Sequence, residues 1–254
     1  MQHLVSLTSR ETATAVILEA SLSVGESLTK ELVAQINTLC DQAEDAAVGS
    51  IVRINLESHH RAEARRSDGS HTIDINLVNH WERALRRLEC TPCVTVAVAT
   101  DDIGGLSLAL LLCTDCRVVG ESTRLGLSHA GQTRLPGMVL YRLSHQLGPM
   151  LSRRMALLNR WLSSQEALQH GLVDAVSSQP SLAVHGLMQE LQQHDLTHAS
   201  LHRRLILEAP SVSYENALGS HLAACDRILR QAQAGLLTTA AKASCPTQPQ
   251  WGTK

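Results

Sequence analysis

The sequence of 254 residues contains no phenylalanine, and aromatic side chains make up only 2% of it. Proteins that bind single-stranded nucleic acids stack the bases on aromatic rings, so this composition argues against such a partner. The formal net charge of −2 gives no positive field that would attract a nucleic acid or an anionic membrane. We therefore expect a core of Leu, Val, Ala and Ile, with neither a nucleic acid nor a membrane as partner.

Targeting signals and long apolar runs are also missing. Residues 1–6 contain no basic segment that leads into the apolar stretch of a signal peptide. No apolar run reaches the ~18 residues that a membrane-spanning helix needs. No linker rich in Gly, Ser or Pro divides the chain. The sequence predicts a cytoplasmic protein with one core over residues 1–195 and a helical extension over residues 196–254.

The chain has seven cysteines, an odd number that argues against a secreted disulfide framework. Four of them form the pairs Cys90 with Cys93 and Cys113 with Cys116, whose separation suits a zinc site. A zinc ribbon places each pair on a tight turn, whereas Cys93 begins a strand pattern and Cys113 ends a helix pattern. We therefore favour buried thiols that pack as small apolar side chains, and we expect no bound metal.

Hydrophobic periodicity predicts strands early in the chain and helices late in it. The expected strands are residues 5–7 and 15–18, joined by a turn at 9–11, and residues 51–56, 94–99, 117–119 and 124–127. The expected helices are residues 28–43 after an N-cap at Ser27, and residues 76–88, 106–112, 138–146, 150–158, 163–169, 182–194, 198–208 and 214–234. The tail over residues 238–254 is expected to fray.

The most informative stretch contains the turn Gly104-Gly105. A buried strand pattern at 94–99 leads into this turn, and a helix that is apolar on every side follows it. The first N–H groups of a helix have no partner within it, and the helix dipole places positive potential behind them. Glycines also let a ligand approach the backbone closely. The sequence therefore predicts a turn that binds an anion or a developing oxyanion.

Further motifs follow at regular spacing. They are Asp115-Cys116-Arg117, Leu125-Gly126, Pro136-Gly137 and Glu166-Ala167-Leu168-x-x-Gly171-Leu172-Val173. Together with the Gly-Gly turn they resemble the enoyl-CoA hydratase/isomerase (crotonase) superfamily over residues 45–176. The resemblance implies an α/β fold of the ClpP/crotonase type, a spiral of β-β-α units, with C-terminal helices that pack in trimers or hexamers. It also implies an acyl-CoA thioester as substrate, without a separate cofactor.

Members of this superfamily polarise the thioester carbonyl with two backbone N–H groups, which form an oxyanion hole. The resemblance places one donor at Gly105 or Leu106, and it places Gly104 and Ser107 beside the substrate. Nothing in residues 58–72 matches the loop that supplies the other donor. One half of the oxyanion hole is therefore unassigned.

The polar segment after the strand at 51–56 contains Arg61, Arg65 and Arg66. Loops that follow strand ends often have functional roles, so we expect these arginines to bind the substrate through its phosphates. A solvated loop without a partner is the alternative.

Hydratases of the superfamily also use two glutamates. An alignment without gaps places the first at Ala109, counted back from Asp115, and the second at His129, counted back from Pro136-Gly137. Neither residue is a carboxylate, so we do not expect two-glutamate addition of water. Imidazole gives and takes a proton near neutral pH, which makes His129 the candidate catalytic residue. A structural histidine beneath the loop is the alternative.

Three other features suggest weaker hypotheses. Ser107 follows the glycines but lacks the second glycine of the G-x-S-x-G motif, so a serine hydrolase or thioesterase is the lesser alternative. His194, His198 and His202 have the spacing of one helix face, without an acidic or Cys partner, and a solvated face is favoured over a metal site. Trp81 and Trp161 lie at amphipathic-helix positions, which predicts packing.

Residues 77–88, 94–98 and 136–143 are similar to a narrower branch, the DpgB-type accessory crotonases. These work beside a type III polyketide synthase in making 3,5-dihydroxyphenylacetyl-CoA, a precursor in antibiotic biosynthesis. The similarity implies help with dehydration and aromatisation of a polyketide thioester, with the synthase or related crotonases as partners. Because Ala109 replaces a carboxylate, a subunit that binds a thioester or a partner without chemistry is the alternative.

Overall fold

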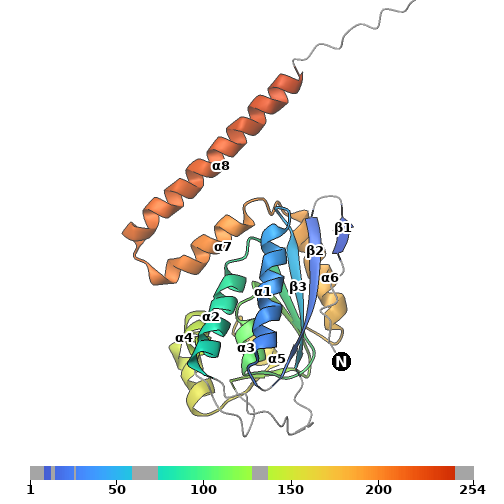
Figure 1. Ribbon diagram of the computed structural model, residues 1–254, viewed down its shortest axis with the longest axis vertical. Helices are drawn as coiled ribbons and strands as arrows, with labels where there is room; N and C mark the ends of the chain where they lie inside the picture. Colours follow the sequence, from blue (N-terminus) through green and yellow to red (C-terminus); the bar gives the residue numbers. More distant parts are fainter. Residues whose placement is uncertain (1–8, 13–14, 26, 59–73, 128–136, 244–254) are drawn as a thin grey trace, which may run out of the picture. The chain divides into compact units, whose positions relative to one another are not determined.

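The computed structural model describes residues 9–12, 15–25, 27–58, 74–127 and 137–243 (Figure 1). The chain forms two compact units, residues 1–200 and 201–254. Over the described residues, no helix combines the length and the apolar character that crossing a membrane requires.

A six-stranded sheet forms the centre of the first unit. Its strands lie in the order β1-β2-β3-β4-β6-β9. The first pair is antiparallel and every other neighbouring pair is parallel. The strands are β1 (Ser9–Thr12), β2 (Ala15–Val24), β3 (Ile51–Ser58), β4 (Val94–Ala99), β6 (Cys116–Gly120) and β9 (Ala175–Ser177). Parallel neighbours need crossover connections, and helices supply most of them here.

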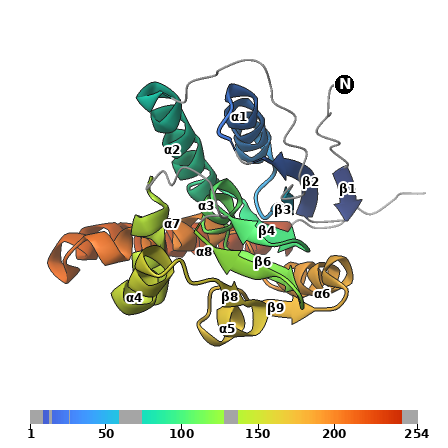
Figure 2. The same ribbon diagram turned by 90° about the horizontal axis from the view of Figure 1, so that it is seen from below.

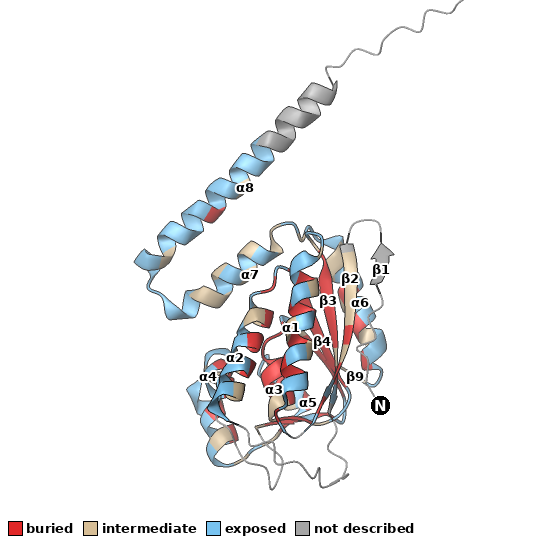
Figure 3. Cartoon of the chain, in the orientation of Figure 1, coloured by how far each residue is buried: buried red, intermediate tan, exposed pale blue. Residues whose placement is uncertain are grey.

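Helices cover both faces of this sheet (Figure 2). One face is covered by α1 (Lys30–Asp45), α2 (Ile75–Glu89) and α3 (Leu106–Leu111), and the other by α6 (Pro180–Gln193). All six residues of β4 are buried, as expected for a central strand of a parallel sheet. Figure 3 shows the buried residues concentrated in the strands and the inner helix faces.

A second, three-stranded sheet holds the Gly-Gly turn. Its order is β5-β7-β8, where β5 is parallel to β7 and β7 is antiparallel to β8. The strands are β5 (Ile103–Gly104), β7 (Arg124–Gly126) and β8 (Leu162–Ser163). The remaining helices are α4 (Val139–Leu157), α5 (Ser164–Gln169), α7 (Ala199–Glu208), a 3-10 turn at Ala209–Ser211, and α8 (Tyr214–Ala243).

Most expected elements are confirmed, and several boundaries were wrong. Residues 9–12 form β1 rather than a turn, while the strand expected at 5–7 lies outside the described residues. The first helix is capped by Thr29, whose hydroxyl accepts a hydrogen bond from the Leu32 N–H at 3.2 Å, and not by Ser27. The helices expected on either side of Gly148 form α4 with a kink there, since Gly148 has φ 75° and precedes Pro149.

Two further expectations fail in the second half of the chain. The final helix extends to Ala243, beyond its expected end at residue 234. His194 caps α6, His198 precedes α7 and His202 lies within α7, so the three histidines share no helix. Within the described ranges, no group of three or more His, Cys, Asp or Glu side chains is placed to hold a metal ion.

Candidate functional site

The Gly-Gly turn joins β5 to α3 and has a backbone that only glycine adopts easily. Gly105 has φ 57° and ψ −120°, a conformation in which a Cβ would be strained. The chain reverses at this residue and enters α3 at Leu106. The second glycine of the motif is therefore required by the backbone itself.

The N–H groups of the turn have different partners. The Gly104 N–H donates to the Ser107 Oγ at 3.1 Å, and the Gly105 N–H donates to the Leu127 carbonyl at 3.0 Å. The Leu106 N–H, on a half-buried residue, has no hydrogen-bond acceptor among the described residues. Of the two donors that the sequence suggested, Gly105 is therefore bonded within the protein, and only Leu106 lacks an acceptor in the described ranges.

Ser107 has a local structural role. Its side chain is 1% exposed, and its hydroxyl donates to the Gly104 carbonyl at 2.8 Å while accepting from the Gly104 N–H. Both contacts fix the turn rather than activate the oxygen. They give no support to a serine nucleophile.

The Asp-x-Arg motif holds the opposite end of α3. The buried Arg117 guanidinium donates to the carbonyls of Leu112 at 3.1 Å, Thr114 at 3.0 Å and Leu172 at 3.0 Å. Burial lowers the pKa of Arg117, and the nearby Asp174 carboxylate opposes this shift. These bonds join α3 to the Gly-Leu-Val turn after α5, so the motif that identifies the superfamily is structural at this point.

Asp115, directly before β6, completes this arrangement. Its Oδ2 accepts hydrogen bonds from the N–H of Thr95 at 2.7 Å and from the Thr95 hydroxyl at 2.8 Å. The carboxylate therefore ties the loop after α3 to the start of β4.

The position of the family's first glutamate is filled by a buried methyl group. Ala109 is 4% exposed and belongs to the main hydrophobic core. Its carbonyl accepts a hydrogen bond from the Cys113 thiol at 3.1 Å. No carboxylate is present at this position to take or give a proton.

Gly137, the second residue of the Pro-Gly motif, lies shortly before α4 and has φ 40°. Glu82 on α2 accepts from the Met138 N–H at 2.8 Å and from the Arg142 guanidinium at 3.0 Å. A Cβ at Gly137 would lie 2.7 Å from the Glu82 Oε1. Glycine at this position lets the Glu82 carboxylate cap α4 closely.

The cysteines divide as buried and exposed thiols. Cys93 and Cys113 are buried, and the Cys93 thiol donates to the Ala43 carbonyl at 3.2 Å. Burial raises the pKa of the Cys113 thiol well above its ordinary value. Cys90 is exposed and Cys116 is half-buried. Cys93 and Cys113 therefore pack as small core residues.

His129, Arg61, Arg65 and Arg66 lie outside the described residues, as does the segment in which the first oxyanion donor was sought. Their proposed roles stay predictions.

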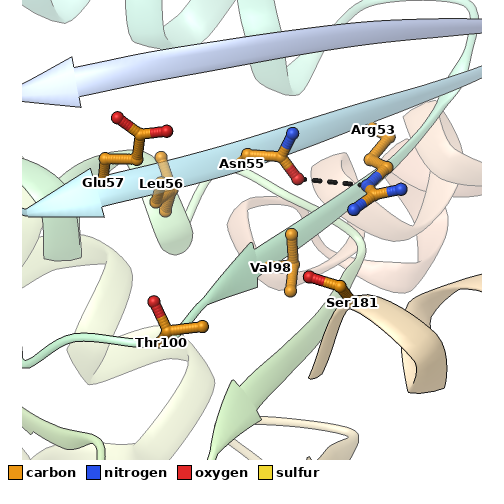
Figure 4. A pocket seen from close by; sticks show the side chains of 7 residues that line it. All are labelled: Arg53, Asn55, Leu56, Glu57, Val98, Thr100 and Ser181. Carbon is orange, nitrogen blue, oxygen red and sulfur yellow. Dashed lines mark hydrogen bonds between the residues drawn. The ribbon is translucent and has the colours of Figure 1, made fainter. Parts of the chain in front are cut away.

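A polar pocket of ≈ 260 Å³ lies on the α6 face of the main sheet (Figure 4). The Arg53 guanidinium, on a residue that is 7% exposed, donates through Nε to Asn55 Oδ1 at 3.0 Å and lies 3.5 Å from Glu19 Oε1. Its Nη1 is 3.4 Å from His185 Nε2. The pocket is lined by Arg53, Asn55, Leu56, Glu57, Val98, Thr100 and Ser181.

Sequence reasoning missed this pocket. The available signal was a pair of polar residues, Arg53 and Asn55, at alternate positions of an otherwise apolar strand. The charge of Arg53 is balanced by Glu19, and Glu57 adds a second carboxylate at the rim. Arg53 therefore has its polar partners, Asn55 and Glu19, within the protein.

The fold and the turn define a crotonase-type protein, and known proteins support this class. The sequence model of the enoyl-CoA hydratase/isomerase family matches residues 60–235. An enoyl-CoA hydratase of Amycolatopsis orientalis is 37% identical over 204 residues, which cover 80% of this chain and 92% of that protein. The chain belongs to the enoyl-CoA hydratase/isomerase family.

Solved structures show the same fold at low identity. An enoyl-CoA hydratase from Bacillus anthracis superposes with a TM-score of 0.72 at 18% identity, over 93% of this chain and 96% of the other. A Thermobifida fusca protein in complex with CoA superposes with a TM-score of 0.72 at 16% identity, over 91% and 95% of the two chains. The expected α/β crotonase fold is therefore confirmed.

Proposed function

We propose that this protein binds an acyl-CoA or polyketide thioester with its carbonyl oxygen at the Leu106 N–H. The observation that carries the proposal is the Gly105 turn, which leaves this N–H without a partner among the described residues. Family membership and the CoA complex of a protein with the same fold support a thioester as the ligand.

The Leu106 N–H stabilises charge that develops on the thioester oxygen. When the α-proton leaves, the carbonyl becomes an enolate, and a fixed donor at its oxygen favours the transition state over the ground state. One such donor is worth about 10²- to 10³-fold in rate where it has been removed from an enzyme. The other donor stays unassigned, because nothing in residues 58–72 matches the loop that supplies it in the family.

The reaction that fits this site is loss of water from a β-hydroxy thioester. His129 takes the α-proton, the electron pair of that C–H bond forms the α,β double bond, and the β C–O bond breaks. The departing hydroxyl takes the proton back from His129 and leaves as water, so the histidine is regenerated. We propose this step as part of dehydration and aromatisation beside a type III polyketide synthase, in keeping with the DpgB-type resemblance.

A non-catalytic partner subunit is the second candidate. The buried methyl of Ala109 favours it, because the helix that usually supplies one acid–base group supplies none here. Such a subunit would hold a thioester, or a related crotonase or the synthase, without turnover. Assembly into a trimer or hexamer through residues 196–254 is part of either proposal.

Calorimetry and proton exchange separate the two candidates. We expect 3-hydroxybutyryl-CoA to bind the full chain and its α-protons to exchange in D₂O. His129→Ala is expected to slow exchange about tenfold or more without loss of binding, and His221→Ala on α8 serves as a matched control without effect. Binding without exchange in the wild-type protein would favour the partner subunit, and absence of binding would contradict both.

A further inference from the structure

An ion pair lies directly before the strand that enters the Gly-Gly turn. The Arg124 N–H donates to Asp102 Oδ1 at 2.9 Å, and the Arg124 guanidinium donates to Asp102 Oδ2 through Nε at 3.1 Å and Nη2 at 2.5 Å. Asp102 lies directly before β5, and Arg124 is the first residue of β7. Both the backbone and the side chain of Arg124 therefore hold one carboxylate.

The Arg124 side chain of this pair lies over the ring of Trp161. The Arg124 guanidinium carbon lies 5.6 Å from the centre of the Trp161 ring, within cation–π range. The indole also covers Gly126 so closely that a Cβ there would lie 2.3 Å from its Cδ2. Trp161 thus packs against both ends of β7.

The contacts between the two strands continue to the candidate oxyanion donor. Ile103 pairs with Leu125 and Gly104 with Gly126 in parallel register. The Gly105 N–H then donates to the Leu127 carbonyl at 3.0 Å, and Leu106 is the next residue. The Asp102–Arg124 pair thus closes one end of a short ladder whose other end adjoins Leu106.

A ladder of two residue pairs is short, so its register depends on its ends. One end is fixed by the Gly105–Leu127 hydrogen bond. The other end is fixed by the Asp102–Arg124 pair, whose guanidinium lies over the Trp161 indole. Loss of the ion pair would leave this end held by the Arg124 N–H alone, and the Leu106 N–H would sample a wider range of directions. Displacement of a group by about 1 Å can cost 10²-fold in rate.

We propose that Asp102 and Arg124, seated on Trp161, are positioning residues that hold the Leu106 N–H in the direction of the thioester oxygen. This inference rests on the proposed function. The Arg124 side chain is 63% accessible and the Asp102 side chain 24%, so water screens the pair and its contribution to the free energy of unfolding is small. The pair therefore affects the direction of the Leu106 N–H more than the stability of the fold.

The test uses Arg124→Met, which keeps the length of the side chain and removes its charge. Arg124→Lys should restore part of the ion pair, and Asp102→Asn should repeat the Met phenotype. The matched control is Arg87→Met, because Arg87 also forms a two-point pair between separate elements, with Glu44 at 2.7 Å through Nε and Nη2. The control pair joins α1 to α2 and does not contact the turn.

Two readouts are measured on the full chain. The first is the infrared band of butyryl-CoA labelled with ¹³C at the thioester carbonyl, which moves to lower frequency when a donor binds the oxygen. The second is hydrogen–deuterium exchange, without ligand, of the Gly105 amide, which is bonded to the Leu127 carbonyl. We expect Arg124→Met and Asp102→Asn to reduce the wild-type carbonyl shift by about half and to raise amide exchange about tenfold, since fewer contacts hold the segment. Arg87→Met should change neither.

The possible failures can be told apart. A wild-type protein that binds no butyryl-CoA, or leaves its carbonyl band unshifted, would overturn the proposed function and the positioning role with it. A normal wild-type shift that Arg124→Met leaves unchanged, with unchanged Gly105 exchange, would overturn the positioning role alone. Equal effects from Arg87→Met would show a general loss of stability and would also overturn it.

Discussion

The two ends of α3 differ in how their backbone groups are satisfied. At the C-terminal end, the Leu112 carbonyl accepts from Arg117 and, at 2.9 Å, from the Gln146 amide, and the Thr114 carbonyl accepts from Arg117 as well. At the N-terminal end, Leu106 has no acceptor within the described part of the chain. The family motif thus fixes one end of the helix, while the other end is the one at which we propose that a thioester binds.

Removing the arginine should disrupt the satisfied end most. Arg117→Met leaves the buried carbonyls of Thr114 and Leu172 without this donor, at about 1–3 kcal/mol for each unsatisfied group, so we expect a loss of about 2–6 kcal/mol in the free energy of unfolding. Urea unfolding measures it. Arg86→Met on the exposed face of α2 should change stability by less than about 0.5 kcal/mol. Equal effects of the two substitutions would contradict the role given to Arg117.

At the open end, the expected change is in both stability and binding. Gly105→Ala forces a Cβ into φ 57°, which costs about 1–3 kcal/mol and redirects the Leu106 N–H. We expect the rate at which the α-protons of the thioester exchange in D₂O to fall about 100-fold. Gly186→Ala is the control, since a Cβ there meets nothing within 4 Å in helix α6 and adds helix propensity. Normal exchange in Gly105→Ala would contradict the account.

The contact between Trp161 and Gly126, near the N-terminal end of α3, can be tested by adding volume to it. Gly126→Ala places a methyl group against the Trp161 indole, and we expect a loss of about 1–3 kcal/mol. Trp161→Leu should relieve the clash, so the double substitution should be less destabilising than the sum of the single ones. Calorimetric unfolding of the four proteins gives the coupling energy. Strict additivity would mean that the two residues do not press on each other.

A pH-dependent element adjoins this region. In α5, the Ser163 hydroxyl accepts from the Glu166 N–H while the Glu166 carboxylate accepts from the Ser163 N–H at 2.9 Å. These bonds and Arg160 hold the pKa of Glu166 below its ordinary value. The stabilisation is therefore present above the ordinary carboxyl pKa and is lost as pH falls through the lowered pKa.

Two substitutions test this cap by thermal unfolding across pH. Ser163→Ala should cost about 1 kcal/mol at neutral pH. Glu166→Gln should flatten the acid limb of the stability profile. An unchanged acid limb would rule out Glu166 as its source.

The smallest effect concerns reactivity rather than stability. Burial raises the pKa of Cys40 to about 12 and that of Cys113 well above its ordinary value, whereas Cys90 and Cys225 are exposed. Because the thiolate is the reactive form, iodoacetamide at pH 8 should label the exposed pair first. Peptide mass spectrometry follows each site. Early labelling of Cys113 would show that the closed end of α3 opens.

The sequence predicts local patterns well and long-range contacts poorly. Apolar periodicity was sufficient for β4 and α3, and the adjacent glycines predicted the turn between them. The packing role of Trp161 is confirmed, but its helical position was wrong, because it precedes β8 and packs on Gly126. Arg124, which lies over its ring, is brought together with Asp102 by strand register, which no local pattern encodes.

In the candidate site, too, the sequence predicts the local pattern and misses the long-range contact. The motif spacing located the Gly105–Leu106 step, but only the structure shows that Gly105 is bonded to Leu127 and that Leu106 is not engaged within the described residues. Which of two adjacent N–H groups is available depends on a carbonyl that lies 22 positions further along the chain.

The central claim is that the Leu106 N–H donates to a thioester carbonyl, and titration of ¹⁵N-labelled protein with butyryl-CoA tests it directly. Formation of a hydrogen bond moves an amide proton downfield. We predict a downfield shift of the Leu106 amide proton, with a much smaller change at Gly105, whose N–H is already bonded to Leu127. Saturation of the protein with ligand while the Leu106 resonance stays in place would contradict the claim.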